Sequence, residues 1–399
     1  MAAEDESGAL HELIITDVPS MGNFRFVVFA GPNGSLKITS QEQIDRVYAL
    51  ADAVRNSIPP ECRKSADFAK LSAPERDRHM RTVMRQGWGL FRAMAPDALK
   101  REQFRRLLAA HAGIPIRVIQ EAACFPWEAL CLAEDLRSAT HRDFLGWNHA
   151  LIRETVEYNY SRRDAGKAGN TPKVGLIEDD GLPSVVNASN RAAAAHIGPS
   201  TRMKILPPLA GSGDIQILEQ FFADTQDLRN IYQFDCHIDN PSKDVRTSHM
   251  RVSQAFPYHF NDMQSLVVLN NPFVLLNACE GGTVGVKHTE GYAEKLQSHG
   301  AKAVVAAEAR IGDDFAVSFA SLFYRVARKS TEIAEALLKT RRLILAQDHN
   351  PSVLFYGLYG DFSHDLSDAS PGAKAAIELG NYRLSDVWPP SKEPSPDFR

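Results

Sequence analysis

A histidine and a cysteine, each at the end of a separate apolar segment, are the residues of this sequence best suited to catalysis. The segment NIYQFDCHIDN contains His237, and the segment NPFVLLNACEGG contains Cys279, 42 residues further along the chain. A cysteine thiol has a pKa of about 8.5 and is mostly protonated at neutral pH, whereas a nearby imidazole lowers that pKa or accepts the proton. The pair therefore predicts nucleophilic catalysis by a thiolate, provided that the two segments lie side by side.

The residues around the pair fit this chemistry. Gly281 and Gly282 follow Cys279 closely and allow a tight turn, in which backbone N–H groups face a developing oxyanion. Cys236 directly precedes His237, so its side chain points to the opposite face of the strand and is expected in the core. Taken alone, Cys279 has the same alternative, because cysteine is among the most frequently buried residues.

The elements that would position the pair follow a regular alternation. Short apolar segments lie at 173–177, 202–206, 230–236, 273–278 and 301–307, and helical segments at about 184–196, 213–223, 291–299, 312–328 and 331–346. Such an alternation predicts parallel βαβ units in a doubly wound sheet, whose functional residues lie at the carboxyl ends of the strands. His237 and Cys279 stand at two such ends. The segment SVLFYGLYGD, at 352–361, is predicted to add an edge strand.

The N-terminal half has a different pattern. Two strand-like segments, 13–18 and 24–30, are separated and closed by turn residues and predict a hairpin. Helical spacing of apolar residues follows from about Ser40 to Ala112, and 114–120 reads as a strand. The Gly/Asn/Pro-containing segment DAGKAGNTP has the composition of a linker. We therefore predict a helix-rich α/β half at 1–165, a catalytic region at 166–361 and a Pro-rich tail at 362–399.

Composition excludes several classes of function. The chain has 399 residues and a formal net charge of -4, so no global field draws it to nucleic acid or to an anionic membrane. Its five cysteines form neither a CxxC pair nor an even set, and no HExxH motif occurs. The N-terminus is acidic and lacks the pattern of a signal peptide. We therefore expect a cytoplasmic protein with no metal or organic cofactor, whose partners are proteins rather than nucleic acid or membrane.

One segment has a net positive charge, in contrast to the chain as a whole. Residues 61–113 contain 12 Lys or Arg against 6 Asp or Glu, an excess of +6. The simplest interpretation is the solvated outer face of helices. The alternative is a docking surface for an acidic partner or an inhibitory segment.

Three longer stretches resemble a known family. The stretches VLLNACEGG, YAEKLQSHGAKAVVAAEARIGDDFAVSFASLFYRVARKSTEIAEALLKTRRLILAQ and NPSVLFYGLYGD resemble the CHAT family of caspase-like cysteine peptidases, which is related to caspases and separase. Upstream, IPIRVIQEAACFPWEAL resembles the Pro-Trp-Glu element of that family, so the resemblance covers most of residues 110–361. It implies a caspase-like α/β fold, with a mostly parallel sheet and helices on both faces, preceded by the helix-rich α/β N-terminal half.

The resemblance also implies roles for residues. Cys279 matches the family's nucleophile and His237 its paired histidine, and the oxyanion donors would be the backbone N–H groups of Cys279 and Ile238. Two positions depart from the family pattern. Ile238 stands where the family usually has Gly, and Glu308 and Arg310 lie in a stretch where the family tends to have a Trp-Pro pair.

The resulting expectation is a cysteine endopeptidase that cleaves a dedicated protein substrate, alone or with a regulatory protein partner. A role in bacterial antiviral defence or cell death is implied by the resemblance alone. The residues Asp235, Glu308 and Arg310 are candidates for the substrate pocket, and two carboxylates there would favour Arg or Lys before the scissile bond. Arg310 could instead neutralise Glu308 or receive an acidic substrate residue. A further alternative is that the three residues pair with one another and only build the edge of the sheet. The alternative, suggested by Ile238, is a non-catalytic caspase-like interaction module.

Other motifs carry less weight. Glu178, Asp179 and Asp180 at the end of the first predicted strand resemble the Mg²⁺-binding acidic cluster of receiver domains. That function also needs an acceptor aspartate, for which Asp235 is a candidate, and a Lys-Pro pair after 301–307, which is absent. The nucleotide-binding motifs GxGxxG and the P-loop are absent as well, as is the GxSxG motif of α/β-hydrolases.

Overall fold

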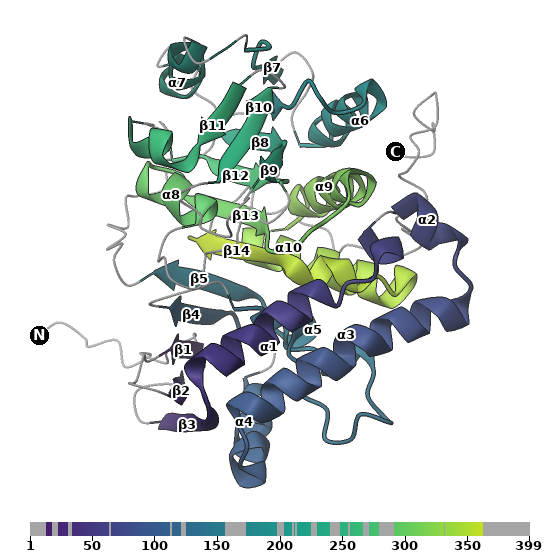
Figure 1. The fold of residues 1–399 in the computed structure, drawn as a ribbon. Helices are drawn as coiled ribbons and strands as arrows, with labels where there is room; N and C mark the ends of the chain where they lie inside the picture. Colours follow the sequence, from purple (N-terminus) through teal and green to yellow (C-terminus); the bar gives the residue numbers. More distant parts are fainter. Residues whose placement is uncertain are drawn as a thin grey trace, which may run out of the picture.

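The computed structural model describes most of the chain between Leu13 and Asp361 (Figure 1). The described residues are 13–17, 23–30, 34–63, 65–111, 114–120, 125–155, 173–197, 203–209, 211, 214–224, 230–239, 248–253, 256–265, 271–278, 291–330 and 332–361. Cys279, Gly281 and Gly282 lie outside the described residues, as do Cys124 and the predicted tail.

Eleven strands of the described chain form one sheet, in the order β3-β2-β1-β4-β5-β14-β13-β12-β8-β6-β7. They are β1 (Leu13–Asp17), β2 (Asn23–Ala30), β3 (Gly34–Gln43), β4 (Ile116–Gln120), β5 (Leu151–Thr155), β6 (Val174–Glu178), β7 (Met203–Ile205), β8 (Ile231–Asp235), β12 (Phe273–Leu276), β13 (Ala303–Ala307) and β14 (Tyr356–Gly360). A second sheet contains β9 (His237–Asp239), β10 (His249–Ser253) and β11 (Phe256–His259).

The helices of the described chain belong to two groups. In the N-terminal half they are α1 (Ile44–Asn56), α2 (Ser65–Lys70), α3 (Ala73–Met94), α4 (Ala98–Ala110) and α5 (Leu145–Asn148). In the second half they are α6 (Ser184–Ala194), α7 (Ile215–Ala223), α8 (Tyr292–Ser298), α9 (Asp313–Ala327) and α10 (Ile333–Leu343). Within the part of the chain that the structure describes, no helix is both long and apolar enough to span a bilayer.

The alternation of strands and helices after the linker-like segment is confirmed. The five apolar segments become β6, β7, β8, β12 and β13, and each pairs in parallel with its neighbours among them. The helical segments between them become α6 to α10. The N-terminal hairpin is confirmed too, because β1 and β2 pair antiparallel with Ile15 opposite Val28.

Side chains of the central strands alternate between two hydrophobic cores, one on each face of the sheet. Ile231 and Phe273 belong to a large core that also contains residues of α6, α9, α10 and the N-terminal helices. Phe234 and Leu276 belong to a smaller core, formed with α7, α8 and the second sheet. Helices therefore cover both faces of the parallel part, as the sequence predicts.

The position of the last strand corrects one expectation. The segment 352–361 was expected at an edge, but β14 lies inside the sheet, antiparallel to β13 and parallel to β5. All five of its residues are buried. A strand pattern indicates burial but not the neighbours of a strand, and here the missing neighbour comes from the N-terminal half. The two halves consequently share one continuous sheet (Figure 1).

Candidate active site

The two strands that precede His237 and Cys279 are neighbours. Strands β8 and β12 run parallel, with Phe234 opposite Leu276, and the N–H of Asn277 donates to the carbonyl oxygen of Phe234 at 2.9 Å. His237 begins β9, two residues after β8 ends. Cys279 follows the described residue Ala278 directly and is itself outside the described residues. The expected adjacency of the two strands is therefore confirmed, whereas the contact between thiol and imidazole stays a prediction.

A side-chain hydrogen bond joins the ends of these strands. Asn277 Nδ2 donates to Asp235 Oδ1 at 3.2 Å, and Gln233 Nε2 donates to Asp235 Oδ2 at 2.6 Å. The hydroxyl of Tyr356, from β14, donates to Asn277 Oδ1 at 2.9 Å. Asp235 precedes His237 by two residues, and Asn277 precedes Cys279 by two residues. The Asp235–Asn277 hydrogen bond therefore joins the ends of β8 and β12. Each of the two predicted catalytic residues follows one of these strand ends in the sequence.

Asp235 is an unusual carboxylic acid. Its side chain is buried, and burial raises its pKa to about 7, against the opposing effect of the hydrogen bonds from Gln233 and Asn277. A carboxyl group with such a pKa exists in both charge states near neutral pH. The sequence identified Asp235 as a pocket candidate, but both of its oxygens accept bonds from the interior.

His237 itself is half-buried and lies opposite Arg251 of β10. Arg251 Nε lies 3.6 Å from Asp179 Oδ2 and 3.6 Å from Asp239 Oδ2, so its charge is shared between two carboxylates. The N–H of Asp179 donates to the carbonyl oxygen of Asp235 at 2.9 Å, which ties this charged group to the end of β8. Sequence reasoning missed Arg251, because its segment lacks a recognisable motif.

Glu178 and Asp179, at the end of β6, are engaged by arginines rather than gathered as a metal site. Arg191 Nη2 donates to Glu178 Oε2 at 2.7 Å, and Arg251 approaches Asp179. No group of three or more His, Cys, Asp or Glu suited to a metal ion occurs in the described segments. The contacts of Glu178 and Asp179 therefore do not support the hypothesis of a receiver domain.

Ile238 adopts a regular strand conformation. It lies in β9 opposite Met250 of β10, and its side chain packs against the smaller core. Among the described residues other than glycine, positive φ angles occur only at Asn271 and His349. Ile238 therefore stands in place of the family's Gly without backbone strain.

The described cysteines are core residues. Cys236 is 4% exposed and belongs to the smaller core, which confirms its expected place in the interior. Burial raises the pKa of Cys62 and of Cys131 to about 12. Thiols with such pKa values are almost fully protonated at neutral pH and are poor nucleophiles.

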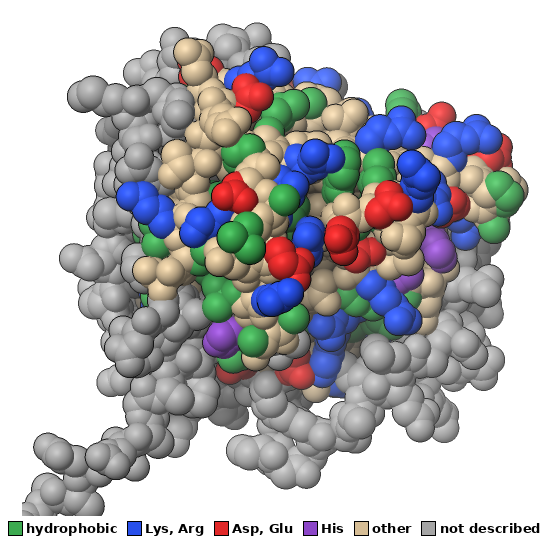
Figure 2. Space-filling model, turned by 90° about the horizontal axis from the view of Figure 1, so that it is seen from below, with side chains coloured by type: hydrophobic (Ala, Val, Ile, Leu, Met, Phe, Trp, Pro, Cys, Tyr) green, Lys and Arg blue, Asp and Glu red, His purple; other side chains and the backbone are tan. Residues whose placement is uncertain are grey.

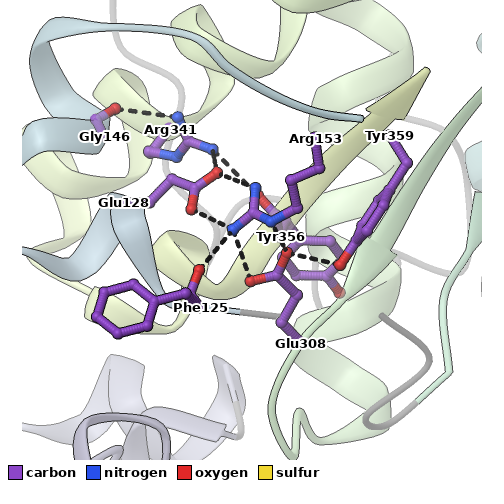
Figure 3. Close-up of polar contacts among 8 residues, drawn as sticks. All are labelled: Phe125, Glu128, Gly146, Arg153, Glu308, Arg341, Tyr356 and Tyr359. Atoms are coloured by element: carbon purple, nitrogen blue, oxygen red, sulfur yellow. Dashed lines mark hydrogen bonds and ion pairs between the residues drawn. The ribbon is translucent and has the colours of Figure 1, made fainter. Parts of the chain in front are cut away.

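Glu308, a second pocket candidate, lies in the interior (Figure 3). Arg153 Nη2, from β5, donates to Glu308 Oε2 at 2.9 Å, and the hydroxyl of Tyr359 donates to Oε1 at 2.9 Å. The structure thus departs from the expectation that Asp235 and Glu308 face an open acidic pocket, because both are buried and bound from within. Arg310, the third candidate, is exposed.

The same cluster contains a second buried ion pair (Figure 3). Arg153 Nη1 donates to Glu128 Oε1 at 2.8 Å and Arg153 Nη2 to Glu128 Oε2 at 2.6 Å. Arg341 Nη2 lies 3.6 Å from Glu128 Oε1 and donates to the carbonyl oxygen of Tyr356 at 3.0 Å. Burial lowers the pKa of Arg341 to about 10. The two arginines and the carboxylates of Glu128 and Glu308 form a neutral set.

This cluster explains several motifs on which the family resemblance rests. Glu128 belongs to the Pro-Trp-Glu element, Arg341 to the stretch that ends in TRRLILAQ and Tyr359 to the stretch NPSVLFYGLYGD. These motif residues hold the N-terminal half against the second half and do not surround His237.

Comparison with known proteins supports the same fold. Residues 254–383 match the family model of the CHAT domain. The match includes Cys279 and begins after His237. The predicted CHAT resemblance is therefore confirmed in the second half of the chain. No curated protein matches the sequence.

Two crystal structures of the Saccharomyces cerevisiae separase–securin complex resemble this structure. The one at 3.0 angstrom resolution matches with a TM-score of 0.51 and 10% identity, and the one at 2.6 angstrom with 0.51 and 11%. Each match covers 88% of this chain but only 30% of that chain. This likeness extends beyond the CHAT segment into the N-terminal half and confirms the caspase-like α/β fold. At such identities it concerns the fold alone.

Proposed function

We propose that this chain is a cysteine endopeptidase in which Cys279 is the nucleophile and His237 is its paired acid and base. The proposal is carried by one observation: β8 and β12 are adjacent parallel strands whose ends are joined by the Asp235–Asn277 hydrogen bond. Adjacent strands lie about 4.8 Å apart, so residues two positions beyond this bond on either strand emerge from the same edge of the sheet. The match of the segment around Cys279 to the CHAT domain supports the assignment.

The proposed reaction is acyl transfer to a thiol. His237 accepts the proton of Cys279 as Sγ attacks the peptide carbonyl carbon, and the backbone N–H groups of Cys279 and Ile238 stabilise the oxyanion. His237 then donates its proton to the leaving amine when the peptide C–N bond breaks. Water hydrolyses the thioester, which releases the acid product and restores the thiol. The reaction requires neither metal nor organic cofactor.

The proposed substrate is a dedicated protein, and a regulatory protein partner is part of the proposal. The matched separase structures are complexes with securin, so a relative in fold binds a protein partner. A role in antiviral defence remains an implication of the family resemblance, and a cytoplasmic location remains an expectation from the composition and the N-terminal sequence.

The test is proteolysis in cells that co-express this chain with the products of neighbouring genes. Mass spectrometry would compare protein fragments between wild type, Cys279→Ala and His237→Ala. Because the thiol and imidazole act as one unit, each variant should abolish cleavage, and the double variant should be no worse than either. Cys236→Ala is the matched control, since it removes a buried thiol beside His237 and should leave cleavage intact.

Two results would contradict the proposal. Fragments that persist in Cys279→Ala would exclude this thiol as nucleophile. Loss of cleavage accompanied by unfolding of Cys279→Ala, measured by circular dichroism, would identify a core cysteine instead. A folded wild type that cuts nothing with any co-expressed product would favour the non-catalytic interaction module.

A further inference from the structure

A groove lined by arginines runs along α3 in the N-terminal half. Its larger hollow, of about 420 Å³, lies between α3, α4 and the segment 133–134, and it includes Trp88 and Phe91 in its walls. A second hollow, of about 170 Å³, lies between α3 and the segment 136–137. The α3 residues 81, 85, 88 and 92 are spaced to share one helix face, along which both hollows lie, and the two hollows together are called the arginine groove.

Positive charge dominates this arginine groove. Its walls contain Arg81, Arg85, Arg92, Arg101, Arg105, Arg106 and Arg137, whereas the acidic residues in them are Glu102 and Glu134. Glu102 is already engaged, because Arg106 Nε donates to it at 2.7 Å and Arg105 Nε at 3.2 Å. In the described part of the chain, Arg85, Arg92 and Arg137 have no carboxylate within ion-pair distance. Figure 2 views the molecule from this end and shows basic side chains spread over the surface, with acidic ones between them.

The groove is held in shape by contacts that do not neutralise it. The guanidinium of Arg92 lies over the ring of Trp88, 4.6 Å from its centroid, and Trp88 Nε1 donates to the carbonyl oxygen of Ala133 at 3.0 Å. Arg101 Nη1 donates to the carbonyl oxygens of Ala95 and Pro96 at 2.6 and 2.7 Å. Burial, and then the charges of Arg92 and Arg105, lower the pKa of Arg101. Arg101 is thus held by backbone carbonyls beside the like charges of Arg92 and Arg105.

We propose that this arginine groove binds an acidic peptide segment of a protein partner. Guanidinium groups bind carboxylates through two parallel hydrogen bonds, and the partly exposed apolar side chains of Trp88 and Leu136 line the same walls. The recognised segment therefore has acidic residues with apolar residues between them. Arg81 and Arg92 are separated by about 16 Å along the helix axis, the length of roughly five extended residues.

A peptide fits these observations better than nucleic acid. The chain carries a net charge of -4, and the arginines of the groove stand beside walls that are partly apolar. A phosphate backbone offers nothing to those apolar walls and gains most from a broad basic face. The groove lies near the β3 end of the sheet, whereas β8 and β12 lie toward the other end (Figure 1). Binding there leaves the strand ends of the candidate active site open.

The test is fluorescence anisotropy with the full chain and a fluorescein-labelled peptide of about ten residues that alternates Glu with Leu or Phe. We expect saturable binding that weakens with salt, and no binding of the peptide in which Gln replaces each Glu. The double variant Arg85→Glu/Arg92→Glu should weaken binding more than about tenfold. The control Lys70→Glu/Lys204→Glu makes the same change in net charge at exposed sites outside the groove and should retain wild-type affinity.

Four outcomes would overturn the assignment. Equal binding of the Gln peptide, or equal losses in both double variants, would show that the groove does not recognise carboxylates. Tighter binding of a labelled oligouridine than of the acidic peptide would indicate nucleic acid. Binding that appears only after removal of residues 1–12, which contain four acidic residues, would identify the chain's own N-terminus as the occupant.

Discussion

At the residue scale, Asp235 links the candidate active site to pH. Its pKa is about 7 in the folded chain because of burial, against 3.8 for an ordinary aspartate. Between these values the folded state binds the proton more tightly than the unfolded state does. The contribution of Asp235 to stability therefore decreases as pH rises toward 7 and stays low above it.

This linkage predicts the behaviour of Asp235→Asn, which cannot ionise. From pH 5 to pH 8 the free energy of unfolding of the wild type should fall relative to that of the variant, by on the order of 2–3 kcal/mol. Urea denaturation at several pH values measures the difference. Parallel pH profiles for the two proteins would show that Asp235 does not hold a raised pKa.

Single residues also mark where sequence reasoning succeeds and where it ends. Alternation along a strand correctly placed Cys236 in the core. The partner of Glu308 could not be predicted, because Arg153 is 155 residues away in the sequence and does not belong to a recognisable motif. The contact of Asn277 with Asp235 could have been predicted, because each residue lies two positions before a predicted catalytic residue on adjacent strands.

At the element scale, the close packing of α3 on the Pro-Trp-Glu segment depends on a glycine. A Cβ added at Gly87 would lie 2.0 Å from the carbonyl oxygen of Ala129, whereas one added at Gly89 would meet nothing within 4 Å. Both glycines lie in the same helix, so helix propensity favours alanine at each by about 1 kcal/mol.

The two substitutions should therefore have opposite effects. Gly87→Ala must displace backbone and is expected to destabilise the chain by about 1–3 kcal/mol, whereas Gly89→Ala should leave it unchanged or slightly more stable. Thermal denaturation followed by circular dichroism measures both. An equal gain in melting temperature for the two variants would mean that α3 does not pack this closely on Ala129.

Helices and strands were predicted best where the spacing of apolar residues within one segment is enough to identify it. Apolar segments alternating with helical ones predicted β6, β7, β8, β12 and β13 and the helices α6 to α10, because each element buries its own face. Strand β3 was missed, since its sequence GSLKITSQEQ is polar and lies at the sheet edge. The internal place of β14 could not be predicted, because its partner β5 belongs to the other half of the chain.

At the scale of the whole molecule, the buried ion cluster joins the two halves. Arg153 on β5 binds Glu128 of the N-terminal half and Glu308 of the second half. Replacing Arg153 by Met leaves two buried carboxylates without their partner and should cost about 3–5 kcal/mol. Arg117→Met is the matched control: Arg117 pairs with Glu154 near the surface, so its loss should cost at most about 1 kcal/mol. Similar losses in both variants would contradict this function of the cluster.

The shared sheet makes a second prediction about the two halves. If a protease site is inserted in the linker-like segment 164–172 and cleaved, the fragments should stay together, because β5 pairs with β14. Size-exclusion chromatography should then give one peak that contains both fragments, and they should separate only in denaturant. Two separate folded fragments in native buffer would show that the halves are independent domains.

The central claim is that His237 activates Cys279, and pulsed alkylation measures this most directly. Iodoacetamide reacts with the thiolate, so its rate at Cys279 in the folded chain, determined by peptide mass spectrometry at pH 6, is compared with the rate for an unfolded peptide of the same sequence. We predict a rate at least about tenfold higher in the folded chain, and a loss of that gain in His237→Ala. A rate at Cys279 no higher than in the free peptide, and unchanged by His237→Ala, would contradict the proposed catalytic pair.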